Sequence, residues 1–146
     1  MSATTRLPHP VRAAAMAVAV VFLLVGVLGF VPGLTADLDR IAFAGPESHA
    51  HLLGVFQVSV LHNLVHLLFG AVGLVAARAA SSARAYLVAG GAVYLLLWVY
   101  GLVVHKDSGA NFVPLNAADD WLHLGLGLGM VALGLALKGN PNARSA

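Results

Sequence analysis

Four long apolar runs, separated by shorter polar stretches, limit the folds open to this chain. They cover residues 13–34, 52–77, 85–104 and 121–137, and none contains Asp, Glu, Lys or Arg. About 20 apolar helical residues cross the hydrocarbon core of a bilayer. The runs lack the period-two alternation of membrane strands, and four strands cannot close a barrel. The sequence therefore predicts an all-α fold, a four-helix transmembrane bundle.

The distribution of charge predicts how the bundle is oriented. Charged residues make up only 10% of the chain, whereas soluble domains contain about 25%. All six acids lie in residues 35–51 and 105–120, while six of the eight bases lie in the terminal tails and in residues 78–84. Cytoplasmic loops are rich in Lys and Arg. We therefore expect an up-down-up-down, multi-pass protein of the plasma membrane with both termini cytoplasmic, and no nucleic-acid partner, because the bases form no run.

The chain is predicted to form a single integral membrane domain over residues 1–146. Its spans are expected at about 13–34, 52–77, 85–104 and 119–137, with residues 139–146 as a disordered cytoplasmic tail. The first span could instead be a cleaved signal peptide. Its apolar run exceeds the 7–15 residues, roughly, of a signal-peptide core, so we expect it to be retained.

Polar and small residues share one face on each of the two central spans. At 100° per residue, two sets each fall within an arc of about 100°. They are Ser59, His62, Asn63, His66, Gly70 and Gly73 on the second span, and Gly90, Gly91, Tyr94, Trp98, Gly101 and His105 on the third. We expect these faces to pack inward, with the polar side chains as hydrogen-bonding contacts between helices and Tyr94 bonded to His62.

The fourth span is rich in glycine. Gly125 and Gly129 lie on one side of it, and Asp119, His123, Met130 and Gly134 on another. Small residues four apart allow helices to approach closely, within one subunit or between two. We favour packing within one subunit and leave a homo-oligomer as the alternative.

The histidines also allow a metal or haem site. His62 and His66 are four residues apart on one helical face, and His123 with Asp119 could complete a site for zinc, copper or iron. Haem b could be ligated by His62 and His123, although counting from the span ends puts their depths about 9 Å apart. A small proton-linked transporter is a third possibility. We expect packing contacts and no cofactor.

Three segments carry a resemblance to a known family. They are HNLVHLLFG at 62–70, YLLLWVYG at 94–101 and NFVPLNAADDWLHLG at 111–125. The chain resembles an uncharacterised actinobacterial family of four-helix integral membrane proteins, domain of unknown function family 4383. The resemblance implies no activity. It marks as characteristic His62, Asn63, His66, Asn111, Pro114, Asn116, Asp119, Trp121 and His123. The chain departs from the family pattern at Asp120, where the pattern has Asn.

The last of these segments forms an external motif. Its members are Asn111, Pro114, Asn116, Asp119, Asp120, Trp121 and His123. Asn116 or Asp119 can cap the fourth helix, and Trp121 suits the headgroup region. Since no candidate nucleophile stands beside a base, we predict a non-enzymatic accessory or scaffolding subunit that sits in the lipid bilayer and contacts a membrane-protein partner or a second copy. The alternatives are the haem or metal protein and the transporter.

Overall fold

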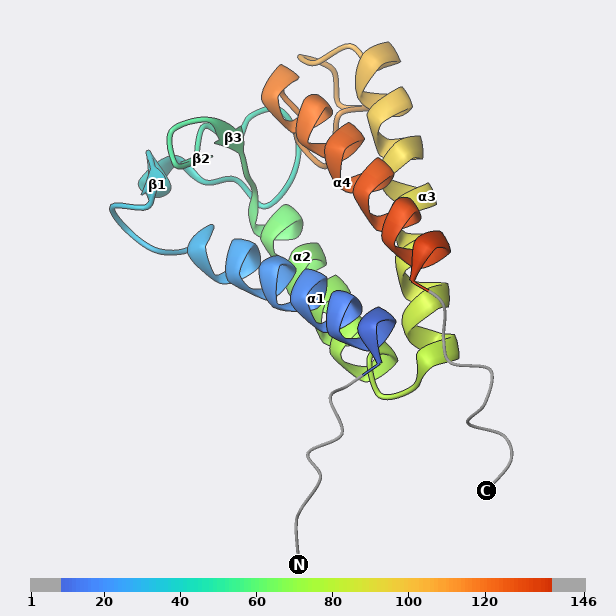
Figure 1. Cartoon of the computed structure of the whole chain (residues 1–146). Coiled ribbons are helices and arrows are strands. Elements are labelled where there is room, and N and C mark those ends of the chain that lie inside the picture. Colours follow the sequence, from blue (N-terminus) through green and yellow to red (C-terminus); the bar gives the residue numbers. More distant parts are fainter. Residues whose placement is uncertain (1–8, 138–146) are drawn as a thin grey trace, which may run out of the picture.

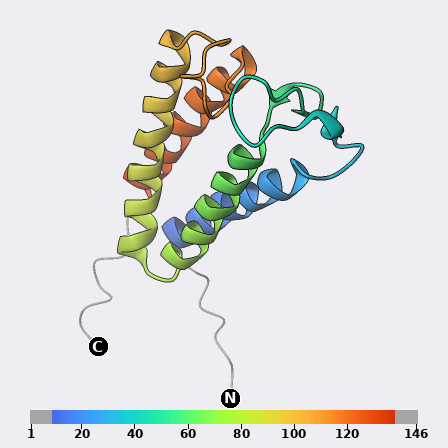
Figure 2. The ribbon, with the colours of Figure 1, turned by 180° about the vertical axis from the view of Figure 1, so that it is seen from behind.

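The protein folds into four helices arranged as two pairs (Figure 1), in a computed structural model that describes residues 9–137. The helices are α1 (Pro10–Leu28), α2 (Val60–Ala76), α3 (Ala80–Val103) and α4 (Ala117–Ala136). α1 packs along α2 and α3 along α4, whereas contacts between the pairs are sparse. Figure 2 shows the pairs diverging towards the end that carries the loops. The four predicted helices are confirmed, and the predicted tail 139–146 lies outside the described residues.

Three helix starts follow from the local sequence. Pro10 occupies the first position of α1, where its missing N–H costs nothing. The Ser59 side chain accepts a hydrogen bond from the backbone N–H of His62 and caps α2. Asn116 and Asp119 form a capping box at α4, each side chain accepting from the backbone N–H of the other. The predicted cap at the external motif is therefore formed.

The second apolar run is not helical throughout, and this part of the all-α prediction is wrong. Three short strands, β1 (Thr35–Ala36), β2 (His51–Leu52) and β3 (Phe56–Gln57), form an antiparallel sheet in the order β1-β2-β3. Leu53 and Gly54 join the last two with φ angles of 55° and 70°. A right-handed helix cannot pass through such a pair, so α2 begins only at Val60.

Two other predicted boundaries also shift. The first span was expected to reach residue 34, but α1 ends at Leu28 and a loop follows, in which Gly33 has a φ of 84°. α3 begins five residues earlier than the predicted 85 because the chain turns tightly after Ala77. The Ser82 hydroxyl stabilises that turn by donating to the carbonyl oxygen of Ala76.

Glycines bring the backbones of each helix pair into contact. A Cβ placed on Gly91 of α3 would lie 2.9 Å from the Gly127 carbonyl oxygen of α4. A Cβ on Gly70 of α2 would lie 2.8 Å from the Ala19 carbonyl oxygen of α1. The predicted inward faces are buried, except that Trp98 is half-buried and His105 is exposed beyond the end of α3.

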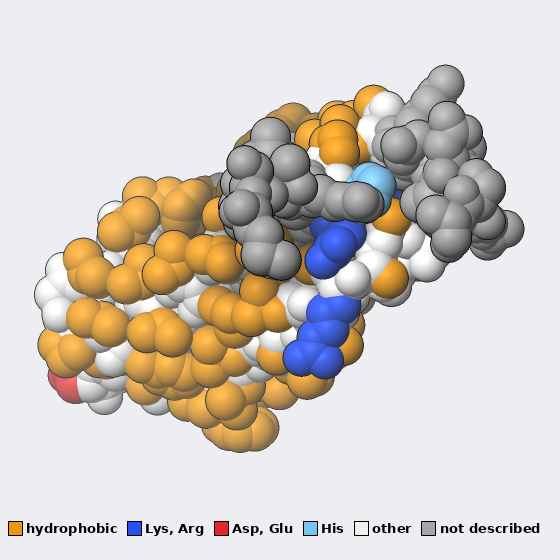
Figure 3. All heavy atoms as spheres, turned by 60° about the horizontal axis from the view of Figure 1, so that its bottom comes forward, with side chains coloured by type: hydrophobic (Ala, Val, Ile, Leu, Met, Phe, Trp, Pro, Cys, Tyr) orange, Lys and Arg blue, Asp and Glu red, His pale blue; other side chains and the backbone are white. Residues whose placement is uncertain are grey.

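The surface of the helices is apolar. Large hydrophobic side chains point outward from all four, among them Met16, Leu24, Leu68, Val75, Leu96, Val99, Leu128 and Leu135. Figure 3 views the molecule from the end that lies at the bottom of Figure 1 and shows apolar side chains covering most of the visible described surface. Within residues 9–137, α1 and α3 are long and apolar enough to cross a membrane, while α2 has 17 residues and is shorter.

Candidate functional site

A cavity of about 230 Å³ lies between α1, α2, α4 and the loop that carries the sheet. Its polar lining is confined to α2 and the start of α4, as His62, His66, Asp119 and His123. The apolar lining comes from α1, the loop and α4, as Val21, Phe22, Val25, Leu28, Leu52, Leu53, Phe56, Val58, Leu122 and Leu126. The cavity thus combines a polar side with apolar walls.

The structure brings the three predicted histidines to this one cavity. The His62 and His66 rings stack with their centroids 4.6 Å apart, and the side chains are 5% and 7% exposed. His123, 4% exposed, lies on α4 with the Tyr94 ring edge-on at 5.1 Å. The predicted difference in depth is wrong because it was counted from Leu52. Since α2 begins at Val60, His62 lies in its first turn, as His123 lies near the start of α4.

The buried polar groups of this region lack the hydrogen bonds that were predicted. The Nδ1 atoms of His62, His66 and His123 are enclosed without a hydrogen-bond partner, and so are both polar atoms of the Asn63 amide. Tyr94 packs against Phe22, Phe69 and His123, and no bond from it to His62 forms in the described chain. The predicted bond between Tyr94 and His62 is therefore wrong, and the enclosed Nδ1 and amide atoms make no hydrogen bond to another helix in the described chain. Buried polar groups without partners are rare and call for an explanation.

A chain of packed aromatic rings runs from the cavity wall at His66 and Phe22 towards Tyr86. Phe22 stacks on His66 and on Tyr94, with centroid distances of 5.6 Å and 5.3 Å. Phe69 packs edge-on against Phe22 at 4.9 Å and lies 5.1 Å from Tyr86.

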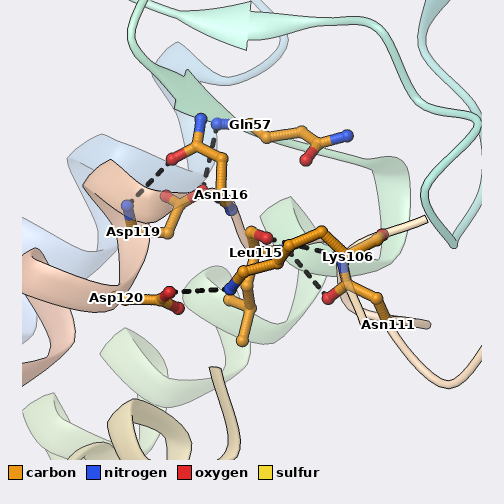
Figure 4. Close-up of polar contacts among 7 residues, drawn as sticks. All are labelled: Gln57, Lys106, Asn111, Leu115, Asn116, Asp119 and Asp120. Carbon is orange, nitrogen blue, oxygen red and sulfur yellow. Dashed lines mark hydrogen bonds and ion pairs between the residues drawn. The ribbon is translucent and has the colours of Figure 1, made fainter. Parts of the chain in front are cut away.

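The external motif ties α4 to the loops above the cavity (Figure 4). Asp119 Oδ2 accepts the backbone N–H of Asn116 at 3.0 Å and that of Gln57, in β3, at 3.2 Å. The Asn111 amide bonds both to the Lys106 carbonyl oxygen and to the backbone of Leu115. These contacts fix the end of α4 against the sheet and hold Asp119 at the cavity wall.

Asp120, Pro114 and Trp121, three other members of the external motif, do not take part in these contacts between α4 and the sheet. Lys106 Nζ lies 2.7 Å from Asp120 Oδ2, while Asp120 Oδ1 is buried without a partner beside Gly101. Pro114 is fully buried, and Trp121 is 65% exposed. Asp120 is therefore paired with a lysine from the preceding loop.

The arrangement does not form a metal centre. Within residues 9–137, no group of three or more His, Asp or Glu side chains is placed to hold a metal ion, so His62, His66, His123 and Asp119 share a cavity without a common coordination point. The cavity has a volume of about 230 Å³, which is below the roughly 300–1,000 Å³ of pockets for drug-sized ligands, so its size gives the haem alternative no support. The sequence does not reveal the apolar side of the cavity, because its hydropathy predicts a helix over residues 52–58, where the structure has a loop with two short strands.

Comparison with known proteins gives one match. A family model described as "Domain of unknown function (DUF4383)" matches residues 12–136, which include the cavity and the external motif. No curated protein and no solved structure matches the chain.

Proposed function

Because the chain belongs to the DUF4383 family, whose description gives no activity, we propose its function from the structure: it is a four-span integral membrane protein with a non-enzymatic, accessory role. The observation that carries the proposal is the distribution of polarity. Outward positions on the helices are large and apolar, such as Leu68 and Leu96, whereas His62, Asn63 and His66 are buried. In water this arrangement would be unfavourable, but in lipid it removes the polar groups from the hydrocarbon.

The positions of the arginines support the orientation with both termini cytoplasmic. Arg12 Nε donates to the carbonyl oxygen of Ala77 at the end of α2, and Arg84 Nε donates to that of Gly134 in the last turn of α4. A cation is favourable at a helix C-terminus. Both arginines lie at the end of the bundle opposite Asp119 and Asp120. The rule that cytoplasmic loops are basic then places this end in the cytoplasm.

The acids support a role without catalysis. Asp119 accepts hydrogen bonds from two backbone N–H groups and Asp120 pairs with Lys106, so both acids hold the loops to α4.

An accessory protein also needs a surface for its partner. Gly125 and Gly129 were predicted to pack within one subunit, but they face outward on α4, and a Cβ added at either would have no described atom within 4 Å. Such a pair permits close approach of another helix.

Cysteine labelling tests the membrane topology, and the chain has no native Cys to interfere. Single variants Ser81→Cys and Ser108→Cys would be treated in intact cells with a thiol reagent that does not cross membranes. We expect only Ser108→Cys to react, and Ser81→Cys to react after the membrane is opened. Equal labelling of both in intact cells, or release of the protein by alkaline carbonate, would refute the proposed topology.

Disulfide cross-linking tests the accessory role. Gly129→Cys should yield a cross-linked dimer or a larger adduct in native membranes on mild oxidation, because this face of α4 is open. Leu96→Cys, equally outward on α3 with 69% exposure, is the control and should remain a monomer. If neither variant is cross-linked, the α4 face has no partner and this part of the proposal fails.

A further inference from the structure

We propose that the cavity binds a membrane-dissolved amphipath whose head is a single ring with carbonyl or hydroxyl oxygens, namely a quinone or phenol with an apolar tail. The inference rests on the proposed membrane location. It starts from the lining of the cavity, where three almost fully buried imidazoles and the carboxyl group of Asp119 are the polar groups of an otherwise apolar wall.

The histidines define the polar groups of the ligand. With Nδ1 enclosed on His62, His66 and His123, Nε2 is the atom through which each ring can meet a ligand. A neutral imidazole nitrogen donates or accepts according to its tautomer. Carbonyl and hydroxyl oxygens match this set, because three rings on two helices can bond to oxygens on different edges of one flat head.

The absence of a cation argues against an anionic head. Among residues 9–137, no Lys or Arg lines this cavity, whereas the carboxyl group of Asp119 does. A carboxylate or phosphate placed there would face an acid without a fixed counter-charge, at a high cost in a site removed from water. A ligand without formal charge incurs no such cost.

The cavity volume and its aromatic walls define the head. An apolar cavity of about 150 Å³ takes up benzene, so about 230 Å³ accommodates one substituted ring. Phe22 and Phe56 contribute flat walls next to the imidazoles, and aromatic rings pack favourably against one another in stacked or edge-on geometry. A planar head is therefore preferred to a branched one of equal volume.

The apolar rim defines the tail. Val21 on α1 is 50% exposed, Leu122 on α4 is 39% exposed, and Leu53 in the loop is 62% exposed, yet all three also line the cavity. α1 and α4 have few contacts with each other. If these helices are surrounded by lipid, an alkyl tail can leave the cavity between them and remain in hydrocarbon.

Binding would be measured by calorimetry with the full chain in lipid nanodiscs, using a benzoquinone with a decyl tail, and empty nanodiscs as the blank. We expect saturable binding of one quinone per chain. Leu122→Trp at the rim should weaken it at least tenfold, while Leu128→Trp, which faces outward on the same helix, should not. His66→Phe should weaken binding about tenfold by removing a hydrogen bond, and exposed His105→Phe should leave it unchanged.

Two further ligands separate the head from the tail. Decanol and undecanoate carry the same ten-carbon tail with a lone hydroxyl or an anionic head, and both should bind at least tenfold more weakly than the quinone. Equal binding of decanol would mean that the cavity recognises only an alkyl chain and would overturn the proposal. The proposal would also be overturned if quinone binding were not saturable, or if Leu122→Trp bound the quinone as tightly as the unchanged protein.

The controls keep this inference separate from the proposed function. Thermal melting identifies any variant that fails to fold. If His66→Phe does not fold, the comparison of Leu122→Trp with Leu128→Trp decides the outcome. Labelling of Ser108→Cys tests the membrane location independently of any ligand. A correctly oriented protein that binds no quinone refutes only the inference about the cavity.

Discussion

Replacing Gly91 by Ala tests whether α3 and α4 are in backbone contact. The added Cβ would lie 2.9 Å from the Gly127 carbonyl oxygen and 2.9 Å from the Val131 backbone nitrogen, so one helix must move. Overpacking of this kind costs about 1–3 kcal/mol, partly offset by about 1 kcal/mol from the better helix propensity of Ala. Gly125→Ala, with no described neighbour within 4 Å, gains the propensity term alone.

The two variants should therefore differ in stability by roughly 1–3 kcal/mol. At about 2–4 °C per kcal/mol for a chain of this size, Gly91→Ala should melt some 2–12 °C below Gly125→Ala in the same detergent, followed by intrinsic tryptophan fluorescence. Gly129→Ala, also open, should behave like Gly125→Ala. If Gly91→Ala melts with these controls, α3 and α4 are not in backbone contact at this position and the packing described for the pair is refuted.

Three further substitutions can be checked by the same melting measurement. Lys106→Met should lose about 1–2 kcal/mol by leaving a buried carboxylate unpaired, and should lose almost nothing in an Asp120→Asn background; equal losses would contradict the ion pair. Asn116→Ala should cost about 1 kcal/mol through loss of the α4 cap, and an unchanged melting point would argue against the capping box. Asn63→Leu should be neutral or stabilising because its amide has no partner; a large loss would show that the amide is hydrogen-bonded in the folded protein.

The helix faces could be predicted because helical period and polarity act locally. His62, His66 and Gly70 recur at intervals of four residues, and this spacing determined the buried face of α2 wherever the helix began. The cap at Asn116 was predictable for the same reason, since capping depends on residues three positions apart. These features require no knowledge of the rest of the chain.

The cavity could not be predicted because it depends on where the chain leaves the helix. Hydropathy does not distinguish a buried strand from a helical segment, so the residues before Ser59 were assigned to a span. The signals present were Gly54 and Ser59, a turn residue and a capping residue within an apolar run. These two residues together predict a helix that begins after Ser59, which places His62 at a depth similar to that of His123. The pairing of Lys106 with Asp120 depends on a loop path that no local pattern encodes.

In the proposed membrane location, the unequal lengths of the helices would have a consequence for the surrounding lipid. At 1.5 Å per residue, the 17 residues of α2 and 19 of α1 extend about 26 and 28 Å, whereas the 24 of α3 extend about 36 Å. A bilayer core of about 30 Å is thus too thick for one pair and too thin for α3. Hydrophobic mismatch of opposite sign on the two sides of one small protein should thin the bilayer beside α1 and α2, tilt α3, and favour neighbours or membrane regions of matching thickness.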